Sequence, residues 1–330
     1  MKNEKKALIK KLSKQLWQGR NDSNAPTRLH EAIIFNDIDK ISKWPFANKH
    51  VGFLGFSSDE GVRRNLGNIG AVEGPDALRR ALANLPIPQQ AMIFSDFGTV
   101  CCQNDALEEA QSELAEIVKK MIGKDILPIL LGGGHEIAWA NYQGISAACP
   151  DKKITVINFD AHFDLRPLLL DDKGSSGTSF TQISKFCAEH SKPFDYICLG
   201  IQEMSNTSLL FETAENLKVK ILLADEFHLG GIEPALEFLD EVLLHSEVIH
   251  LTICLDVFAS AFAPGVSAPQ SLGLMPWQVI PLLHRLASSG KVISLDIAEL
   301  CPPRDIDGRT AHLAAALIYQ FLNHYHCPKT

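Results

Sequence analysis

The stretch ITVINFDAHFDLR (154–166) combines a buried strand with a cluster of ionisable side chains. Its apolar half is typical of a strand that is covered on both faces, as in a parallel sheet. The second half places Asp160, His162 and Asp164 at alternate positions, so in an extended chain their side chains point to one side. The stretch therefore predicts a parallel strand whose carboxyl end carries a polar site.

Further short apolar runs occur along the chain, each followed by a helix-like stretch such as 105–123 or 234–246. The alternation predicts an α/β fold with a mostly parallel, doubly wound sheet of about eight strands flanked by helices. We expect an N-terminal extension over 1–50 and a single catalytic domain over 51–330. The remaining predicted strands are VGFLGF (51–56), MIFSDF (92–97), ILPILLG (126–132), DYICLG (195–200), VKILLAD (219–225), IHLTICLD (249–256) and KVISLDI (291–297).

Composition excludes several classes of protein. The formal net charge of −8 disfavours nucleic acid and other polyanionic partners. No run of 18 or more apolar residues occurs, and we interpret the basic segment 1–17 as a solvated helical face, so no membrane partner is expected. The eight cysteines form no CxxC pair, which is typical of buried thiols in a reducing compartment. We therefore expect a cytoplasmic homo-oligomer that acts on a small molecule.

Two other predicted strands end in polar residues. LLGGGHEIAWANYQG (130–144) carries His135, and LTICLDVFASAFAPG (251–265) carries Cys254 and Asp256. In a doubly wound sheet the active site lies at the carboxyl ends of the strands, so these groups converge on the Asp-His-Asp cluster. Carboxylates with some imidazole suit Mn²⁺, with Zn²⁺, Co²⁺ and Fe²⁺ as competitors. A pair of such ions can deprotonate a shared water at neutral pH.

These segments resemble the signature blocks of the ureohydrolase superfamily, which includes arginases and agmatinases. The resemblance runs from about residue 50 to the C-terminus and implies an arginase-like three-layer fold. Within the superfamily the chain looks most like the formimidoylglutamase branch, which hydrolyses N-formimidoyl-L-glutamate to glutamate and formamide in histidine degradation. The superfamily blocks are GGGHE, NFDAHFDLR, LDVFASAFAPGVSAP and SLDIAELCPPRD, and the branch-like ones are GVRRNLGNIGAVEGPDALR (61–79), HEIAWANYQG, SSGTSFTQI (175–183) and APGVSAPQSLGL (263–274).

The resemblance also implies a ligand set for two metal ions per chain. One ion is expected on His135 and Asp164, the second on His162 and Asp256, and Asp160 is expected to bridge them.

Two residues take catalytic roles in this comparison. Asp164 is expected to accept the proton of the attacking water and pass it to the leaving nitrogen. Glu299, in DIAEL, matches the family glutamate that holds the cationic end of the substrate, although a surface carboxylate at a strand end is the simpler interpretation of that residue.

The third block departs from the family pattern. In the usual S-x-D-x-D-x-x-D block, Cys254 stands where a second bridging aspartate is expected, and Ala259 replaces the last aspartate. A thiolate is a softer ligand, which favours Zn²⁺, Fe²⁺ or Co²⁺, or lower occupancy of Mn²⁺. Cys254 is alternatively an oxidation-prone switch, or a bystander beside a site with one strong ion.

Other departures concern the substrate. Phe180 stands where the arginine-cleaving branch has a histidine, which argues against an arginase. Arg166 replaces an asparagine that faces the substrate in that branch, and a guanidinium can bind a carboxylate with two hydrogen bonds. Asn68 stands where an arginine is expected in the formimidoylglutamase branch. Further candidates for substrate binding are Arg63, Arg64 and Asn141.

Two other functions are consistent with the same residues. One is a ureohydrolase that acts on a guanidino acid or on agmatine. The other is a ligand sensor without catalysis, which the departures at Cys254 and Ala259 favour.

Overall fold

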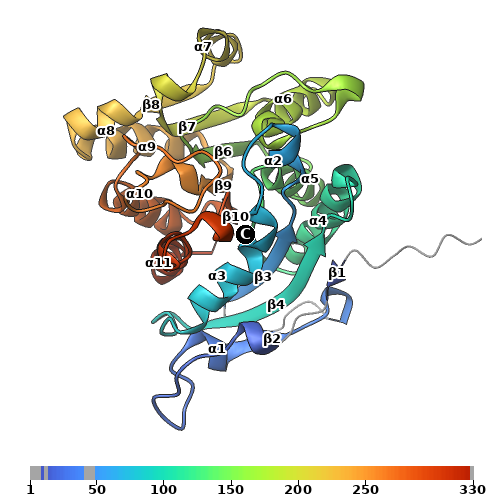
Figure 1. Ribbon diagram of the computed structural model, residues 1–330, viewed down its shortest axis with the longest axis vertical. Helices are drawn as coiled ribbons and strands as arrows, with labels where there is room; N and C mark the ends of the chain where they lie inside the picture. Colours follow the sequence, from blue (N-terminus) through green and yellow to red (C-terminus); the bar gives the residue numbers. More distant parts are fainter. Residues whose placement is uncertain (1–8, 11–13, 41–48, 328–330) are drawn as a thin grey trace, which may run out of the picture.

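A ten-stranded sheet forms the centre of the protein (Figure 1). The computed structural model describes residues 9–10, 14–40 and 49–327. The strands run in the order β1-β4-β3-β5-β10-β9-β6-β7-β8, and β2 also pairs with β4. Their bounds are β1 Ile9–Lys10, β2 Ile33–Phe35, β3 Lys49–Ser57, β4 Met92–Cys101, β5 Ile126–Leu131, β6 Ile154–Phe159, β7 Asp195–Ile201, β8 Lys220–Leu223, β9 Val248–Cys254 and β10 Val292–Ala298.

Helices cover both faces of the sheet and complete three layers (Figure 1). One face packs against α3, α8, α9, α10 and α11, and the other against α4, α5, α6 and α7. The helices are α1 Leu29–Ala32, α2 Glu60–Arg64, α3 Gly74–Ala83, α4 Leu107–Ile122, α5 Ile137–Ala148, α6 Ser179–Glu189, α7 Ser208–Asn216, α8 Ala224–Gly230, α9 Glu233–His245, α10 Pro276–Ser288 and α11 Arg309–His324.

The predicted fold class is confirmed. All eight predicted runs form strands, β3 to β10, and these eight strands pair with one another in parallel, whereas the short β1 pairs with β4 in the antiparallel direction. The two helix-like stretches that were singled out are α4 and α9. The sheet has two more strands than predicted, because β1 and β2 are two and three residues long and too short to show a periodic pattern.

The N-terminal segment is bound to the sheet through a buried carboxylate. Trp17 donates from its indole to Asp96 on β4 at 2.7 Å, and Arg79 of α3 donates to the same carboxylate at 2.7 and 3.0 Å. In the basic segment 1–17, the described part consists of β1 and a short 3-10 turn at Lys14–Leu16. The predicted helical face otherwise lies outside the described residues. The division at residue 50 stays a prediction.

The described helices include none that is long and apolar enough to cross a membrane.

The order of the strands places four carboxyl ends side by side. The last strand in the chain, β10, lies between β5 and β9, and β6 follows on the other side of β9. The ends are in register, since Ile297 of β10 pairs with Leu131 of β5 and with Ile253 of β9, which pairs with Phe159 of β6. Residues that follow these four strands are therefore brought to one place.

Candidate metal centre

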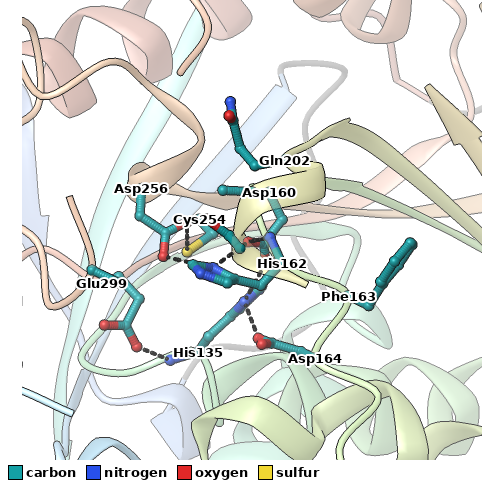
Figure 2. A network of polar contacts seen from close by, with 12 residues as sticks. His135, Asp160, His162, Phe163, Asp164, Gln202, Cys254, Asp256 and Glu299 are labelled. Carbon is teal, nitrogen blue, oxygen red and sulfur yellow. Dashed lines mark hydrogen bonds and ion pairs between the residues drawn. The ribbon is translucent and has the colours of Figure 1, made fainter. Parts of the chain in front are cut away.

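His135 reaches the end of the sheet through a tight glycine turn after β5. The amide of Gly132 donates to Ile297 on β10 at 2.8 Å, and that of Gly133 donates to Phe56 on β3 at 2.9 Å. A Cβ atom on Gly133 would lie 2.0 Å from the carbonyl oxygen of Ser58, so only glycine fits this approach. The turn directs the His135 side chain towards the residues that follow β6 and β9 (Figure 2).

Five of the six predicted ligands form two overlapping groups that share Asp160, one with His135 and Cys254 and the other with His162 and Asp256 (Figure 2). Nδ1 of His135 lies 3.0 Å from Asp160 and 2.8 Å from Asp164. Nδ1 of His162 lies 3.5 Å from the other oxygen of Asp160 and 3.1 Å from Asp256. Asp160 thus presents one carboxylate oxygen to each histidine, which is the arrangement that a bridging ligand requires.

The donor set fits a pair of divalent cations. Nδ1 of His135 is buried and makes no hydrogen bond of normal geometry. A nitrogen lone pair that faces two carboxylates is a typical metal ligand, and the mixture of oxygen and nitrogen donors suits Mn²⁺, Zn²⁺, Fe²⁺ or Co²⁺.

Burial and crowding of charge perturb the titration of these groups. Burial, followed by the charge of Asp160, raises the pKa of Asp164 to about 6. Burial opposes protonation of His135, but the neighbouring carboxylates of Asp160 and Asp164 outweigh it and raise the His135 pKa well above its usual value. His162 behaves in the same way: the carboxylates of Asp256 and Asp160 outweigh its burial and raise its pKa. A cluster of this kind favours bound positive charge, either protons or metal ions.

Cys254 lies within reach of one ion position. Its sulfur forms a potential ligand group with His135 and Asp160, and its thiol donates to Asp256 at 2.9 Å. Burial, followed by the charge of Asp160, raises the pKa of this thiol well above its usual value. The residue is therefore a thiol unless a cation stabilises the thiolate. Metal ligation by Cys254 stays a prediction.

Glu299 is buried beside the cluster and is not a surface carboxylate. It accepts a hydrogen bond from the backbone amide of His135 at 2.9 Å. Burial, followed by the charges of Glu136 and Asp256, raises the pKa of Glu299 well above its usual value. This environment favours the approach of a cation, which would compensate the buried carboxylate.

Both residues with a predicted catalytic role have a left-handed backbone. The φ angle is 48° at Asp164 and 69° at Glu299. This region is unfavourable for residues other than glycine, and strain of about 1–3 kcal/mol per residue is found mostly at functional sites. The surrounding sheet must hold both residues in place.

A cavity of about 200 Å³ opens above the cluster. Acidic side chains form its inner end, and Arg166 is the only arginine or lysine among the described residues that line it. Arg166 is exposed, and it lies near Asn65 because both border the same face of Gly177. The lining residues are Asn65, Gly67, His135, His162, Asp164, Arg166, Ser176, Ser205, Asn206, Leu210, Cys254, Asp256, Ser267, Ala268 and Glu299.

Comparison with known proteins agrees with this architecture. Residues 49–323 match the arginase family. The chain belongs to the arginase family.

Members of the arginase family named formimidoylglutamase are similar to this chain over most of its length. The protein of Legionella pneumophila (strain Lens) is 48% identical over 308 residues, which cover 93% of this chain and 95% of that protein. The protein of Clostridium tetani is 40% identical over 324 residues, which cover 95% of each. The predicted superfamily and its formimidoylglutamase branch are confirmed.

Solved structures of the family have the same fold. Formimidoylglutamase from Bacillus subtilis superposes with a TM-score of 0.80 at 21% identity, covering 93% of this chain and 94% of that one. Trypanosoma cruzi formiminoglutamase, solved with Mn²⁺₂, superposes with a TM-score of 0.75 at 25% identity, covering 88% of this chain and 98% of that one.

Three residues predicted to bind the substrate do not line the cavity. Arg63 is exposed and donates to Glu60 at 2.7 and 2.6 Å. Arg64 is buried between Glu60 and Glu108. Asn141 is buried on α5 and donates from its side-chain amide to Asp296 at 2.7 Å. Glu60 precedes Arg63 by three positions and Arg64 by four. Side chains at these spacings are neighbours on a helix, so the sequence itself predicts that Glu60 pairs with both arginines within α2.

Two departures from family patterns are also placed by the structure. Phe180 is buried, with its ring against that of His135 at 5.5 Å and stacked on Tyr196 at 4.2 Å. Asn68 donates from its backbone and side chain to Ser267, at 2.8 and 2.9 Å, and so joins two loops at the cavity mouth. Asn65, Ser176 and Asn206 also line the cavity. The first two lie within the segments 61–79 and 175–183 that resemble the formimidoylglutamase branch but were not singled out, and no motif contains Asn206.

Proposed function

We propose that this chain hydrolyses N-formimidoyl-L-glutamate to L-glutamate and formamide, as its relatives are named to do. The distribution of charge in the cavity supports this most directly. Acidic groups surround the inner end, whereas the one lining arginine, Arg166, provides a positive charge for an anionic tail. The substrate has the matching distribution, with an amidine that becomes cationic on protonation and two carboxylates.

We propose two Mn²⁺ ions as the native cofactor. A relative has been solved with Mn²⁺₂, and the carboxylate and imidazole donors here suit that ion. A ligating Cys254 would instead favour Zn²⁺, Fe²⁺ or Co²⁺. When bound, such a pair supplies a nucleophile at neutral pH by lowering the pKa of water.

The residues of the chain would then divide the reaction between them. Glu299 faces the amidine and stabilises its positive charge, because its carboxylate is buried in the cavity wall beside other acidic groups. Asp164 lies in the cavity wall next to His135, where its carboxylate would accept a proton from water and return it to the leaving nitrogen. Water adds to the formimidoyl carbon, the bond to the glutamate nitrogen breaks, and Asp164 protonates that nitrogen.

Arg166 would set the position of the substrate. An arginine binds a carboxylate with two parallel hydrogen bonds, which fixes both the distance and the orientation of the ligand. The side-chain amide of Asn65 lies near Arg166 in the cavity wall and offers further donors. Agmatine has no carboxylate and would leave Arg166 without a partner.

A substrate panel tests the function. Purified protein with added Mn²⁺ should release formamide from formimidoylglutamate and should not act on arginine, agmatine or guanidinobutyrate. His162→Ala should remove this activity by several orders of magnitude while the circular dichroism spectrum stays unchanged. Turnover of a guanidino compound alone would favour a ureohydrolase that acts on a guanidino acid or on agmatine. Binding of formimidoylglutamate without any turnover would favour a ligand sensor.

We also propose that the protein acts in the cytoplasm, in histidine degradation. The support is its net charge of −8, the absence of a membrane-crossing helix among the described residues, and its similarity to formimidoylglutamases.

A further inference from the structure

A buried chain of hydrogen bonds lies behind His135, on the side away from the cavity. Nε2 of His135 is 3.0 Å from the hydroxyl of Thr252 on β9. The same hydroxyl donates in a short hydrogen bond to Asp296 on β10. Thr252 and Asp296 are completely buried, and neither lines the cavity. A histidine at the metal centre is thus connected to a carboxylate that substrate does not touch.

Asp296 determines the direction of every bond in this chain. Its carboxylate is hydrogen-bonded to Nε2 of His250 at 2.6 Å and to the side-chain nitrogen of Asn141 at 2.7 Å. The third partner is the hydroxyl of Thr252. Burial opposes its ionisation, but the charge and hydrogen bond of His250 outweigh this and lower the pKa of Asp296. An ionised carboxylate only accepts hydrogen bonds, so all three partners must donate to it.

The direction fixes the tautomer of His135. A threonine hydroxyl has one hydrogen, and Asp296 takes it, so the oxygen of Thr252 can only accept from His135. In the neutral imidazole, which is the form that binds a metal ion, Nε2 of His135 therefore carries the hydrogen and Nδ1 presents its lone pair. That lone pair faces Asp160 and Asp164, where the candidate ion position lies.

The far end of the chain is also fixed. The carbonyl oxygen of Asn141 accepts from the hydroxyl of Ser294 at 2.8 Å, which orients the amide so that its nitrogen points to Asp296. Asn141 and Ser294 are fully buried on α5 and β10. Asn141 thus belongs to the support of the metal centre, which corrects the expectation that it contacts substrate.

We propose that Thr252 and Asp296 are positioning residues that hold His135 in the tautomer and orientation required to bind a divalent cation, with Asn141 and His250 fixing Asp296. The proposal rests on the proposed function, in which His135 is a metal ligand. Groups that orient a ligating histidine in this way typically change metal affinity by about 10–100-fold when removed.

Thr252→Val tests the proposal, because valine keeps the shape and removes the hydroxyl. In equilibrium dialysis with Mn²⁺, the wild type should bind two ions. The variant should bind one ion with unchanged affinity, at His162 and Asp256, and the other about 10–100-fold more weakly. Thr252→Ser keeps a hydroxyl and should restore binding of both ions.

Thr155→Val provides a matched control. Thr155 is also completely buried and also donates to an aspartate on a neighbouring strand, Asp195 at 2.7 Å. It lies at the start of β6, at the opposite end from the site, so its removal should leave both Mn²⁺ affinities unchanged. If Thr252→Val does not fold, Asn141→Leu interrupts the same chain one bond further from His135 and should weaken the same ion.

Several outcomes would overturn the proposal. If folded Thr252→Val binds both ions with wild-type affinity, the positioning role is refuted. The same result in folded Asn141→Leu refutes it where Thr252→Val does not fold. An equal loss in Thr155→Val would assign the effect to general weakening of the sheet. A wild-type protein that binds no Mn²⁺, Zn²⁺, Fe²⁺ or Co²⁺ would overturn the proposed function as well, and dialysis of the wild type distinguishes this case.

Discussion

Arg166→Ala isolates the contribution of the substrate's carboxylates to binding. The backbone of Arg166 is held independently of its side chain, because its amide donates to Gly177 at 3.0 Å and its carbonyl accepts from Thr181 at 2.9 Å. Removal of the guanidinium should therefore leave the loop and the neighbouring Asp164 in place. The effect should appear in substrate binding and not in folding.

The magnitude follows from the exposure of this side chain. Arg166 lies at the open end of the cavity, where water competes for both charges. A hydrogen bond to a charged group in such a setting contributes about 1.5–3 kcal/mol, which corresponds to an increase in KM of roughly 10–150-fold. The turnover number should change little, because Arg166 contacts the tail of the substrate and not the reacting carbon.

The assay measures formamide release across formimidoylglutamate concentrations at saturating Mn²⁺. Arg63→Ala is the matched control, because it removes the same charge from an exposed arginine that pairs with Glu60 outside the cavity. Its KM should equal that of the wild type. An unchanged KM in Arg166→Ala would refute the assignment, and an equal rise in Arg63→Ala would show that the effect is long-range electrostatics.

Three further results are expected. Cys254→Asp should shift the metal preference towards Mn²⁺ and remove the sensitivity of the enzyme to peroxide. If the variant and the wild type have the same peroxide sensitivity and the same metal preference, Cys254 is a bystander. Burial lowers the pKa of His50 to about 4, so the unfolded chain binds this proton more tightly than the folded protein. Unfolding free energy from urea titrations should therefore fall as pH drops from about 6.5 to 4, by at most ~3 kcal/mol, and His50→Gln should flatten this dependence. Trp17→Phe should cost about 1.5–3 kcal/mol by removing the donor to buried Asp96, while Trp277→Phe, at an exposed position, should cost little in the same urea titrations.

The strands and the location of the site could be predicted because they depend on local patterns. Runs such as 154–159 are long and apolar enough to indicate buried strands, and their polar ends mark one edge of the sheet. The order of the strands has no local signal. β10 pairs with β5, which lies more than a hundred residues earlier in the chain, and with β9, which lies about forty residues earlier.

The site residues that the sequence analysis misplaced or missed have different causes. Asn141 lies on a helix that is buried on most of its surface, so no change in polarity marks which face meets the cavity. Thr252 has the pattern of an ordinary strand residue, because its role comes from His135, in the turn after β5, and Asp296 on β10, which only the folded sheet brings close. For Arg63 and Arg64, the pairing with Glu60 was present in the sequence as helical spacing.

The central position of β10 also matters while the chain is being synthesised. Until residues 292–298 leave the ribosome, β5 and β9 each have an unpaired inner edge, although most of the remaining sheet is already available. Unpaired edges of apolar strands are templates for aggregation. The nascent protein therefore depends on its last strand to close the middle of the sheet, and the same strand delivers Glu299. A ribosome that stalls before this point leaves a chain with all of its candidate metal ligands and an open sheet, which makes it a substrate for chaperones or proteases.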